Sequence, residues 1–353
     1  MPGAPQPSVG QAIVSCGLSR WDRPSFLVAC HARLRWDRPS FLVACHAGSS
    51  ALMGRRQWWY AGAVRFEFYR FRFWFRAAGG LHFPAYQSGN ILRGAFGTIL
   101  RRRDGEAYAR VFAPRGVPGE GPSGLQDRPR PFVFRASHLD GRSVREGEAF
   151  HFDVHMFDVR DPALDRFVAA FAELAREGLG PGRGLAQLER VDQLDLNGET
   201  VGRVGDAPAP IGIDLSAPAE RVDRVTVRFV TPTELKAQER LAERPEFPIL
   251  FGRLRDRIGA LRAIYGSGPL EIDFRGMGER AGAVRMTRCE VQWIEAERRS
   301  SRTGQRHPLG GFVGEAEYEG DLGEFLPYLE LGRWVGVGRQ TVWGKGEMRI
   351  MTA

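Results

Sequence analysis

The stretch that decides the fold is VRFEFYRFRFWFR, residues 64–76. Its aromatic residues recur at every second position, and a period of two predicts a β-strand. They fall on two parities, with Phe66 and Phe68 on one and Phe71, Phe73 and Phe75 on the other. Because the parity changes near Tyr69, we expect a β-bulge at that point of the strand.

A helix is predicted soon after this strand, over residues 88–103. Ser88 can cap its N-terminus, and a run of three arginines suits its C-terminus, where the helix dipole favours cations. Apolar residues recur between the two ends at helical spacing and form one stripe. The stripe consists of Ile91, Leu92, Ala95, Phe96, Ile99 and Leu100.

The rest of the first half completes a recognisable order of elements. A Gly- and Pro-rich loop covers residues 113–131, and residues 149–156 alternate as a strand. A second helix begins at Asp161 and Pro162 and ends before Gly178, and another short strand follows. This order, strand–helix–strands–helix–strand, is that of a ferredoxin-like domain.

The second half repeats the order after a polar connector over residues 197–220. Strands and helices are expected there at 222–230 (strand), 247–264 (helix), 284–294 and 311–318 (strands), 321–331 (helix) and 340–351 (strand). The sequence therefore predicts an α+β protein of two tandem ferredoxin-like (βαββαβ) domains with antiparallel sheets. We expect these domains over residues 58–205 and 220–353.

The first 57 residues are set apart by a perfect duplication. The thirteen letters RWDRPSFLVACHA occur at residues 20–32 and again at residues 35–47. Two identical copies of so short a unit indicate a recent duplication or a mis-started reading frame rather than a structural repeat. We therefore expect residues 1–57 to be a disordered extension, and Met53 offers an alternative start.

Composition excludes several classes of protein. The chain has 353 residues, 50 Lys+Arg against 42 Asp+Glu and a net charge of +8, which permits a nucleic-acid partner. Only two of the cations are lysines, and so strong a preference for arginine also arises from a GC-rich genome. No apolar run is long enough to span a membrane, and the 4 cysteines lack metal-ligand spacing. We expect a cytoplasmic protein with no membrane, metal or cofactor.

Two segments could contact phosphates. The first is GRWVGVGRQTVWGKG, residues 332–346, in which Gly336, Gly338, Gly344 and Gly346 would let backbone N–H groups approach an anion beside Arg339 and Lys345. A tight helix-to-strand connection is the alternative explanation of the glycines. The second is RRSSRTGQRH, residues 298–307, which carries four arginines and no acid. A solvated hairpin tip is the alternative there.

A third pattern lies in the strand at residues 149–156. Its residues His151, Asp153 and His155 share one face by parity. Such a trio could hold a metal ion, but a polar outer strand face is much the commoner explanation. We therefore predict no metal site.

The motifs together resemble the CRISPR-associated endoribonucleases that process precursor CRISPR RNA, in the repeat-associated RNA-binding (RAMP) superfamily. The resemblance spans residues 64–350. Its motifs are LRGAFG at 92–97, Thr231-Pro232, the helix end Leu261 to Gly266, Arg299-Ser300-Ser301-Arg302 with Gly310, Gly311 and Gly314, and the glycine-rich segment with Thr341. The family's hairpin tyrosine is replaced here by Arg299 or Ser300, and the cysteine cluster of many relatives is absent from residues 103–131.

The resemblance implies metal-independent cleavage of CRISPR repeat RNA by attack of a ribose 2′-OH, which leaves a 2′,3′-cyclic phosphate. Catalytic residues are expected near the first helix, namely His82, Tyr86 and Arg93, with His307 as the second choice of base. RNA contacts are expected from Arg101, Arg102, Arg298, Arg299, Arg302, Arg306, His307, Arg339 and Lys345. The implied partners are repeat RNA, its product crRNA and CRISPR effector subunits.

Two other functions stay open at this point. A non-catalytic RNA-binding subunit of a CRISPR effector complex would have the same fold. A degenerate relative without RNA function would keep it too. The two RNA-binding alternatives differ in whether a histidine or a Lys/Tyr set converges beside the RNA, and the sequence does not show convergence.

Overall fold

The structure is a computed structural model. It describes residues 64–114, 128–215, 221–237, 240–295, 297–299, 306–308 and 310–352. In the strands at 297–299 and 306–308 it describes the backbone alone. The extension predicted at residues 1–57 lies outside the described residues.

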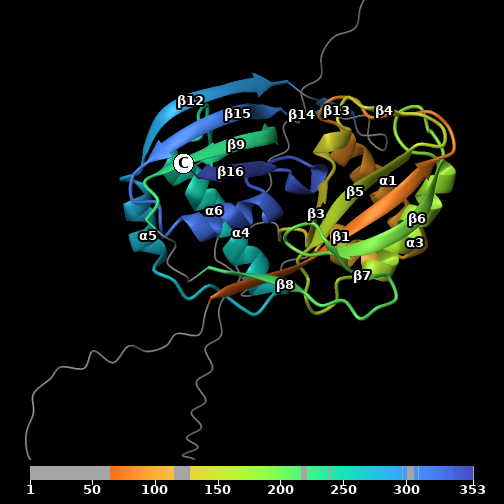
Figure 1. Cartoon of the computed structure of the whole chain (residues 1–353), viewed down its shortest axis with the longest axis horizontal. Helices are drawn as coiled ribbons and strands as arrows, with labels where there is room; N and C mark the ends of the chain where they lie inside the picture. Colours follow the sequence, from red (N-terminus) through yellow and green to blue (C-terminus); the bar gives the residue numbers. More distant parts are fainter. Residues whose placement is uncertain are drawn as a thin grey trace, which may run out of the picture. The chain divides into compact units, whose positions relative to one another are not determined.

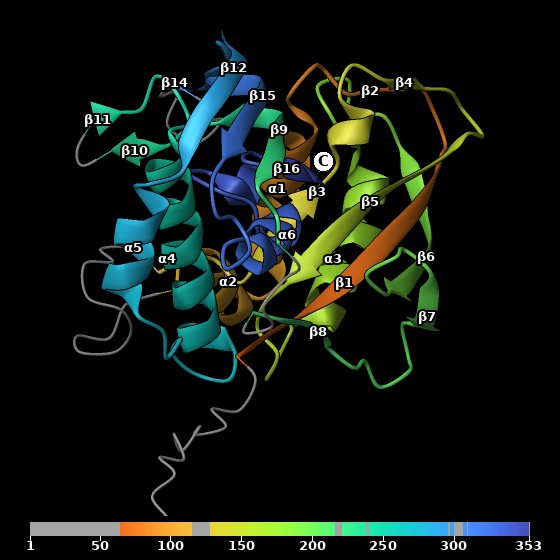
Figure 2. The same cartoon turned by 60° about the vertical axis from the view of Figure 1, so that its left-hand side comes forward.

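The first sheet is antiparallel and has the order β3-β5-β1-β6-β7, with β8 paired to the start of β1. Figure 2 shows β5 beside β1 in this sheet. Its strands are β1 (Arg65–Ala77), β3 (Phe132–Arg135), β5 (Ala149–Met156), β6 (Ala186–Leu194), β7 (Thr200–Arg203) and β8 (Ile211–Asp214). Its helices are α1 (Ser88–Arg103), α2 (Gly105–Phe112) and α3 (Leu164–Glu177).

The second sheet is also antiparallel, with the order β12-β15-β9-β16 (Figure 1). Its strands are β9 (Arg224–Thr233), β12 (Arg285–Ile294), β15 (Gly311–Glu319) and β16 (Met348–Thr352). Its helices are α4 (Phe247–Tyr265), α5 (Phe274–Ala281) and α6 (Leu326–Val335). In both sheets the four main strands stand in the spatial order second, third, first, fourth, so the tandem ferredoxin-like fold is confirmed.

Short elements connect these parts. They are β2 (Leu81–His82), β4 (Ser143–Val144), β10 (Lys236–Ala237), β11 (Arg240–Leu241), β13 (Glu297–Arg299), β14 (Arg306–Pro308) and the 3₁₀ turns η1 (Ser137–Leu139) and η2 (Thr341–Trp343). Among the described residues no helix is long and apolar enough to cross a membrane.

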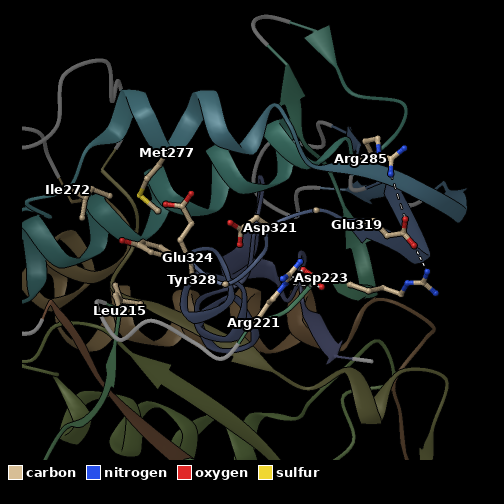
Figure 3. Close-up of a pocket in the computed structure, with 13 residues that line it drawn as sticks. Leu215, Arg221, Asp223, Ile272, Met277, Arg285, Glu319, Asp321, Glu324 and Tyr328 are labelled. Atoms are coloured by element: carbon tan, nitrogen blue, oxygen red, sulfur yellow. Dashed lines mark hydrogen bonds and ion pairs between the residues drawn. The ribbon is translucent and has the colours of Figure 1, made fainter.

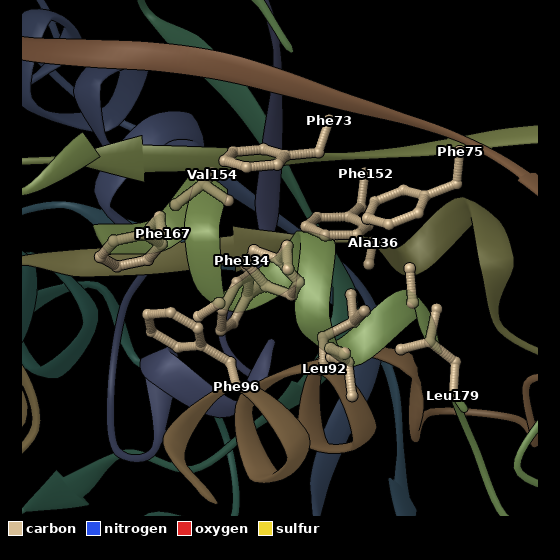
Figure 4. Close-up of a cluster of buried hydrophobic side chains, with 14 of the residues drawn as sticks. Phe73, Phe75, Leu92, Phe96, Phe134, Ala136, Phe152, Val154, Phe167 and Leu179 are labelled. Carbon is tan, nitrogen blue, oxygen red and sulfur yellow. The ribbon is translucent and has the colours of Figure 1, made fainter. Parts of the chain in front are cut away.

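Aromatic rings fill the core of the first sheet and its helices. Figure 4 shows rings from β1, β3 and β5 pointing toward Phe96 of α1. Phe96 stacks on Phe171 of α3 with ring centroids 5.1 Å apart, and Phe73 stacks on Phe152 across two strands at 5.6 Å. Edge-to-face and offset contacts of this kind add to the area that the rings bury.

The parity change in β1 has a cause other than the predicted bulge. The pairing of β1 with β5 runs without a register shift from Tyr69 to Arg76, and the shift in β1 lies between Trp74 and Phe75, against β6. Phe66 and Phe68 are buried in a second core, together with α4 and α6, whereas the strand from Tyr69 onward buries its other face in the first core. The parity therefore changes near Tyr69 because one strand serves two cores, and the irregularity of β1 lies at Trp74 and Phe75 rather than at the expected position.

The region expected as a polar connector, residues 197–220, also contains structure. It holds β7 and β8, and Ile211 to Asp214 pair with the first four residues of β1. Leu215 joins the second core. The connector is thus partly a continuation of the first sheet toward the second core.

Several element ends differ from the prediction. Helix α6 begins at Leu326 rather than Asp321, and β16 begins at Met348 rather than residue 340, because the glycine-rich segment precedes it. Helices α2 and α5 were not predicted. Both start at an aspartate whose carboxylate accepts a backbone N–H, Asp104 from Ala107 and Asp273 from Gly276. These caps are readable in the sequence, but helices of eight residues carry too weak a periodic signal.

Candidate nucleic-acid interface

A cleft of about 280 Å³ lies where β1, β3 and β5 of the first sheet meet the end of α6 and the start of β16. We call it the interdomain cleft. Its lining residues are Arg70, Arg72, Arg135, Ser137, His138, His151, Asp153, His155, Arg333, Trp334, Glu347, Met348 and Arg349. Five arginines against two carboxylates give this lining a positive charge, which suits a polyanion.

Asp153 is the centre of an ion-pair network on the floor of the cleft. Its carboxylate accepts hydrogen bonds from Arg70 at 3.0 Å and from Arg72 at 2.7 Å. These arginines keep the pKa of Asp153 low, although burial acts to raise it. No group of three metal-ligating side chains occurs among the described residues. The trio His151, Asp153 and His155 is a polar strand face, with the carboxylate committed to arginine.

His155 and Arg135 attach the first sheet to the C-terminal end of α6. The Trp334 carbonyl oxygen accepts from His155 Nδ1 at 2.9 Å and from Arg135 Nη2 at 3.0 Å. Burial, followed by the charge of Arg135, lowers the pKa of His155 to about 3, so the imidazole is neutral at physiological pH. The carbonyls at a helix C-terminus attract donors of this kind. The two contacts hold one wall of the cleft against the other.

A second imidazole, His151, lies in a row of rings. Its ring centroid is 4.6 Å from that of Trp74 and 4.6 Å from that of His138, which stacks on it. Burial and the nearby charge of Arg72 lower the pKa of His151 to about 4. The row therefore presents flat ring surfaces beside arginines, an arrangement on which unpaired bases can stack.

The predicted catalytic residues have three different environments. His82 is exposed at the end of β2, and its Nδ1 lies 3.1 Å from Ser143 Oγ. Tyr86 has a left-handed backbone, with φ of 58°, just before α1. Arg93 is partly buried, and its guanidinium lies over the rings of Trp343 at 4.9 Å and Phe112 at 5.3 Å.

The arginines at the end of α1 are exposed, but they differ in whether acidic side chains pair with them. Arg102 forms ion pairs with Glu173 and Glu177 of α3, so acids of the protein already balance its charge. No ion pair to Arg101 is found among the described residues, so its charge is available to a ligand. The ion pairs of Arg102 are exposed and contribute little to stability.

The arginine-rich segment is a hairpin of β13 and β14. Arg298 is the register partner of His307, and Arg299 is that of Arg306. Arg302, predicted as an RNA contact, lies outside the described residues. The expected hairpin is therefore present in the backbone.

The glycine-rich segment is a tight connection from α6 to β16. Its four predicted glycines, Gly336, Gly338, Gly344 and Gly346, all have positive φ. A Cβ on Gly346 would lie 1.9 Å from the Val337 carbonyl oxygen, and one on Gly338 would lie 2.3 Å from that of Glu234. The glycines thus allow the segment to pack closely on its own backbone and on the loop after β9.

The two cations of this segment are engaged by the protein. Arg339 pairs with the buried carboxylate of Glu234. Lys345 is 2% exposed, and its Nζ donates to the Tyr86 carbonyl oxygen at 3.3 Å. Its ammonium is therefore out of reach of a phosphate on the surface.

A larger cavity, of about 1160 Å³, lies elsewhere and has a different charge (Figure 3). Figure 3 shows Arg285 facing Glu319 at one end, and Met277 and Ile272 at the other. Glu319 also pairs with Arg224. Acids outnumber arginines in this lining, so an RNA backbone is better placed in the interdomain cleft.

Sequence reasoning missed Arg70, Arg72, Arg135 and Trp334 of the interdomain cleft. The alternation of Arg70, Arg72 and Trp74 on one parity of β1 was a usable signal for a polar sheet face. Arg135 donates a hydrogen bond to the Trp334 carbonyl oxygen, 199 positions later in the chain, and no local sequence pattern predicts such a long-range contact.

Comparisons with known proteins agree with this architecture. Residues 66–210 match a family model described as an N-terminal domain, and residues 227–348 match the model of the CRISPR-associated endoribonuclease Cas6. No curated protein matches significantly.

Two solved structures with related folds are a Thermus thermophilus Cas6 product complex and a partial Cas6-RT-Cas1–Cas2 complex. The first is 18% identical, covers 81% of this chain and 99% of its own, and has a TM-score of 0.52. The second is 14% identical, covers 82% of this chain and 47% of its own, and has a TM-score of 0.52. At these identities the likeness concerns the fold.

The two sheets and their shared strand order define a tandem ferredoxin-like protein, and a positive cleft lies between them. Its second half, residues 227–348, carries the match to the CRISPR-associated endoribonuclease Cas6.

Proposed function

We propose that this chain cleaves precursor CRISPR RNA inside its repeat, in the cytoplasm and without a metal ion, and leaves a 2′,3′-cyclic phosphate. The observation that carries the proposal is the match of residues 227–348 to the Cas6 endoribonuclease model. The positive interdomain cleft supports it, because an RNA backbone needs cations along its path.

This cleavage reaction requires three roles from side chains. A base takes the proton of the ribose 2′-OH as its oxygen attacks the adjacent phosphorus, and an acid gives a proton to the departing 5′-oxygen. Donors or cations stabilise the charge that develops on the non-bridging oxygens. The bond to the 5′-oxygen breaks as the bond to the 2′-oxygen forms, which closes the cyclic phosphate.

We assign the proton transfers to His82 and the supporting hydrogen bond to Tyr86. His82 is exposed, and its contact with Ser143 Oγ orients the ring while leaving the other ring nitrogen for RNA. A phenol is a poor base at neutral pH, so Tyr86 would serve as a donor. Arg93 would stabilise charge, and His307 is the second choice of base.

RNA contacts are proposed along two surfaces. One is the β13–β14 hairpin, with Arg298, Arg299, Arg302 and Arg306; the other is the interdomain cleft, with Arg333 and Arg349 at its exposed edge. Arg101 extends the basic surface at the end of α1. The resemblance to a Cas6-RT-Cas1–Cas2 complex in fold makes association with other CRISPR proteins a part of the same proposal.

A non-catalytic RNA-binding subunit is the competing function. One observation favours it, namely that aromatic rings cover the guanidinium of Arg93, which limits its access to a reacting phosphate. Both functions use the same fold and the same basic surfaces.

Cleavage of the repeat RNA from the protein's own locus, in EDTA, decides between them. A single cut whose upstream fragment ends in a cyclic phosphate supports the enzyme. The same RNA with one 2′-deoxy nucleotide at the cut should stay intact, and a scrambled repeat is the control for specificity. Tight binding without a cut would instead establish the subunit, and a cut that needs Mg²⁺ would refute the mechanism.

A further inference from the structure

The chain has two lysines, Lys236 and Lys345, and one of them is buried. Lys345 is 2% exposed, although lysine is among the residues least often found inside a protein. Burial lowers its pKa to about 8, and the charge of Asp140 opposes that decrease. An apolar residue would fill the same space at less cost, so the ammonium has a use that packing does not explain.

The two partners of Lys345, Tyr86 and Asp140, both lie at the start of α1. Lys345 Nζ donates to the Tyr86 carbonyl oxygen at 3.3 Å. Asp140, whose charge acts on Lys345, accepts the backbone N–H of Ser88 at 2.9 Å. We call Lys345, Tyr86 and Asp140 the lysine clamp. The clamp holds Tyr86, which precedes the helix, through Lys345. It holds the first backbone N–H of the helix, that of Ser88, through Asp140.

The backbone at Tyr86 is strained and needs such support. A tyrosine with φ of 58° is in the left-handed region, which residues with a Cβ adopt at a cost and keep when their surroundings hold them there. The hydrogen bond from Lys345 acts on the carbonyl of this same residue. It therefore stabilises the conformation that determines where the Tyr86 side chain points.

Two further contacts seat the glycine-rich segment on the same helix start. A Cβ on Gly89 would lie 2.6 Å from the Gly344 Cα, so the two backbones touch. Trp343 lies 4.9 Å from the guanidinium of Arg93. Three consecutive residues of the second half thus contact residues 86, 89 and 93 of the first half, which links the position of the helix start to that of the glycine-rich segment.

We propose that Lys345 is a positioning residue for RNA cleavage, which acts from the second ferredoxin-like half by holding Tyr86 and the start of α1 in place through the lysine clamp. The inference rests on the proposed function. It assigns Lys345 a task different from direct phosphate contact, and it makes cleavage depend on the seating of the glycine-rich segment.

The test compares Lys345→Met with Lys236→Met, the matched change at the other lysine. Lys345→Met should reduce the single-turnover cleavage rate by about 10- to 100-fold, the effect of a small misplacement of a reacting group, while the Kd for repeat RNA stays within about 2-fold. Lys236→Met should cleave at the wild-type rate. A full rate in Lys345→Met would overturn the proposal.

A lost charge could also act by weakening the fold, and two variants separate these causes. Asp140→Asn combined with Lys345→Met removes both charges, so thermal stability should recover while cleavage stays slow. In a Tyr86→Phe background, Lys345→Met should add less than about 2-fold, because it acts through Tyr86. If Lys345→Met reduced the cleavage rate by the same factor in the wild-type and Tyr86→Phe backgrounds, the lysine would have a merely structural role and the proposal would be overturned.

Amide hydrogen exchange tests, independently of cleavage, whether the lysine clamp holds the start of α1 in place. Residues 84–90 should exchange at least about 10-fold faster in Lys345→Met, while α4 keeps its wild-type rate. A wild-type protein that never cuts repeat RNA would refute the proposed function and the catalytic part of this inference. Unchanged exchange over residues 84–90 would refute the clamp itself.

Discussion

Replacing His155 by Gln should remove a large part of the acid sensitivity of the folded state. Burial lowers the pKa of His155 to about 3, from an ordinary value of 6.5. The unfolded chain binds this proton as the pH falls below 6.5, whereas the folded chain does not bind it until about pH 3. Stability therefore falls as the pH falls through this window, and it is restored as the pH rises.

The pKa difference gives the size of the effect. Over the whole window it corresponds to about 5 kcal/mol, at 1.36 kcal/mol per pKa unit. Between pH 8 and pH 4.5 the wild-type protein should lose about 3 kcal/mol of unfolding free energy through this group alone. Glutamine has no charge at either pH, and its amide can still donate to the Trp334 carbonyl oxygen that His155 contacts.

Urea unfolding at the two pH values, followed by tryptophan fluorescence, measures the loss in each protein. The wild type should lose about 3 kcal/mol more than His155→Gln. His138→Gln, at an exposed histidine, is the control and should lose as much as the wild type. Equal losses in wild type and His155→Gln would show that the folded state accepts the proton readily and that the burial argument fails.

Three further changes test the site and its support. His82→Ala should cut the single-turnover rate by about 10² to 10⁴ with unchanged RNA affinity, and a full rate would move the assignment to another histidine. Gly89→Ala should lower the unfolding free energy by about 1–3 kcal/mol, since its Cβ would meet the Gly344 backbone, whereas Gly94→Ala, with open space around it, should not. Arg333→Ala with Arg349→Ala should reduce the slope of log K against log salt by about 1.4–1.8, and an unchanged slope would exclude the interdomain cleft as a phosphate path.

The sequence predicts elements well where local chemistry and burial agree. Helix α1 spans the predicted residues and ends in three arginines, but the prediction of Ser88 as its N-cap was wrong: Gln87 is the cap, and the Ser88 hydroxyl donates to the Ala136 carbonyl oxygen. Strand β5 coincides with its alternating segment, residues 149–156. In both elements one face is apolar along its full length, so that one hydrophobic period decides the structure.

Prediction failed where one element serves two environments. Strand β1 buries Phe66 and Phe68 in one core and Phe71, Phe73 and Phe75 in the other, and a local pattern read that division as a bulge. Strand β8 escaped notice because its four residues lie in a Gly- and Pro-rich stretch and are ordered by pairing with β1. Long-range pairing supplied the stability that local propensity did not indicate.

The functional residues divide in the same way. The glycines of the glycine-rich segment were found by composition, but composition could not distinguish a phosphate loop from a tight connection. The close approach of Gly338 and Gly346 to backbone carbonyl oxygens favours the connection. Lys345 illustrates the limit most clearly. Between two glycines it looked like an exposed phosphate contact, yet its ammonium lies inside, bonded to a residue 259 positions earlier. A cation in a glycine-rich segment can either donate a hydrogen bond to the backbone of its own protein or contact a phosphate. Only its partner in the folded structure distinguishes these two roles. If Lys345 serves Tyr86, the glycine-rich segment contributes to catalysis by holding the helix start, without touching the RNA.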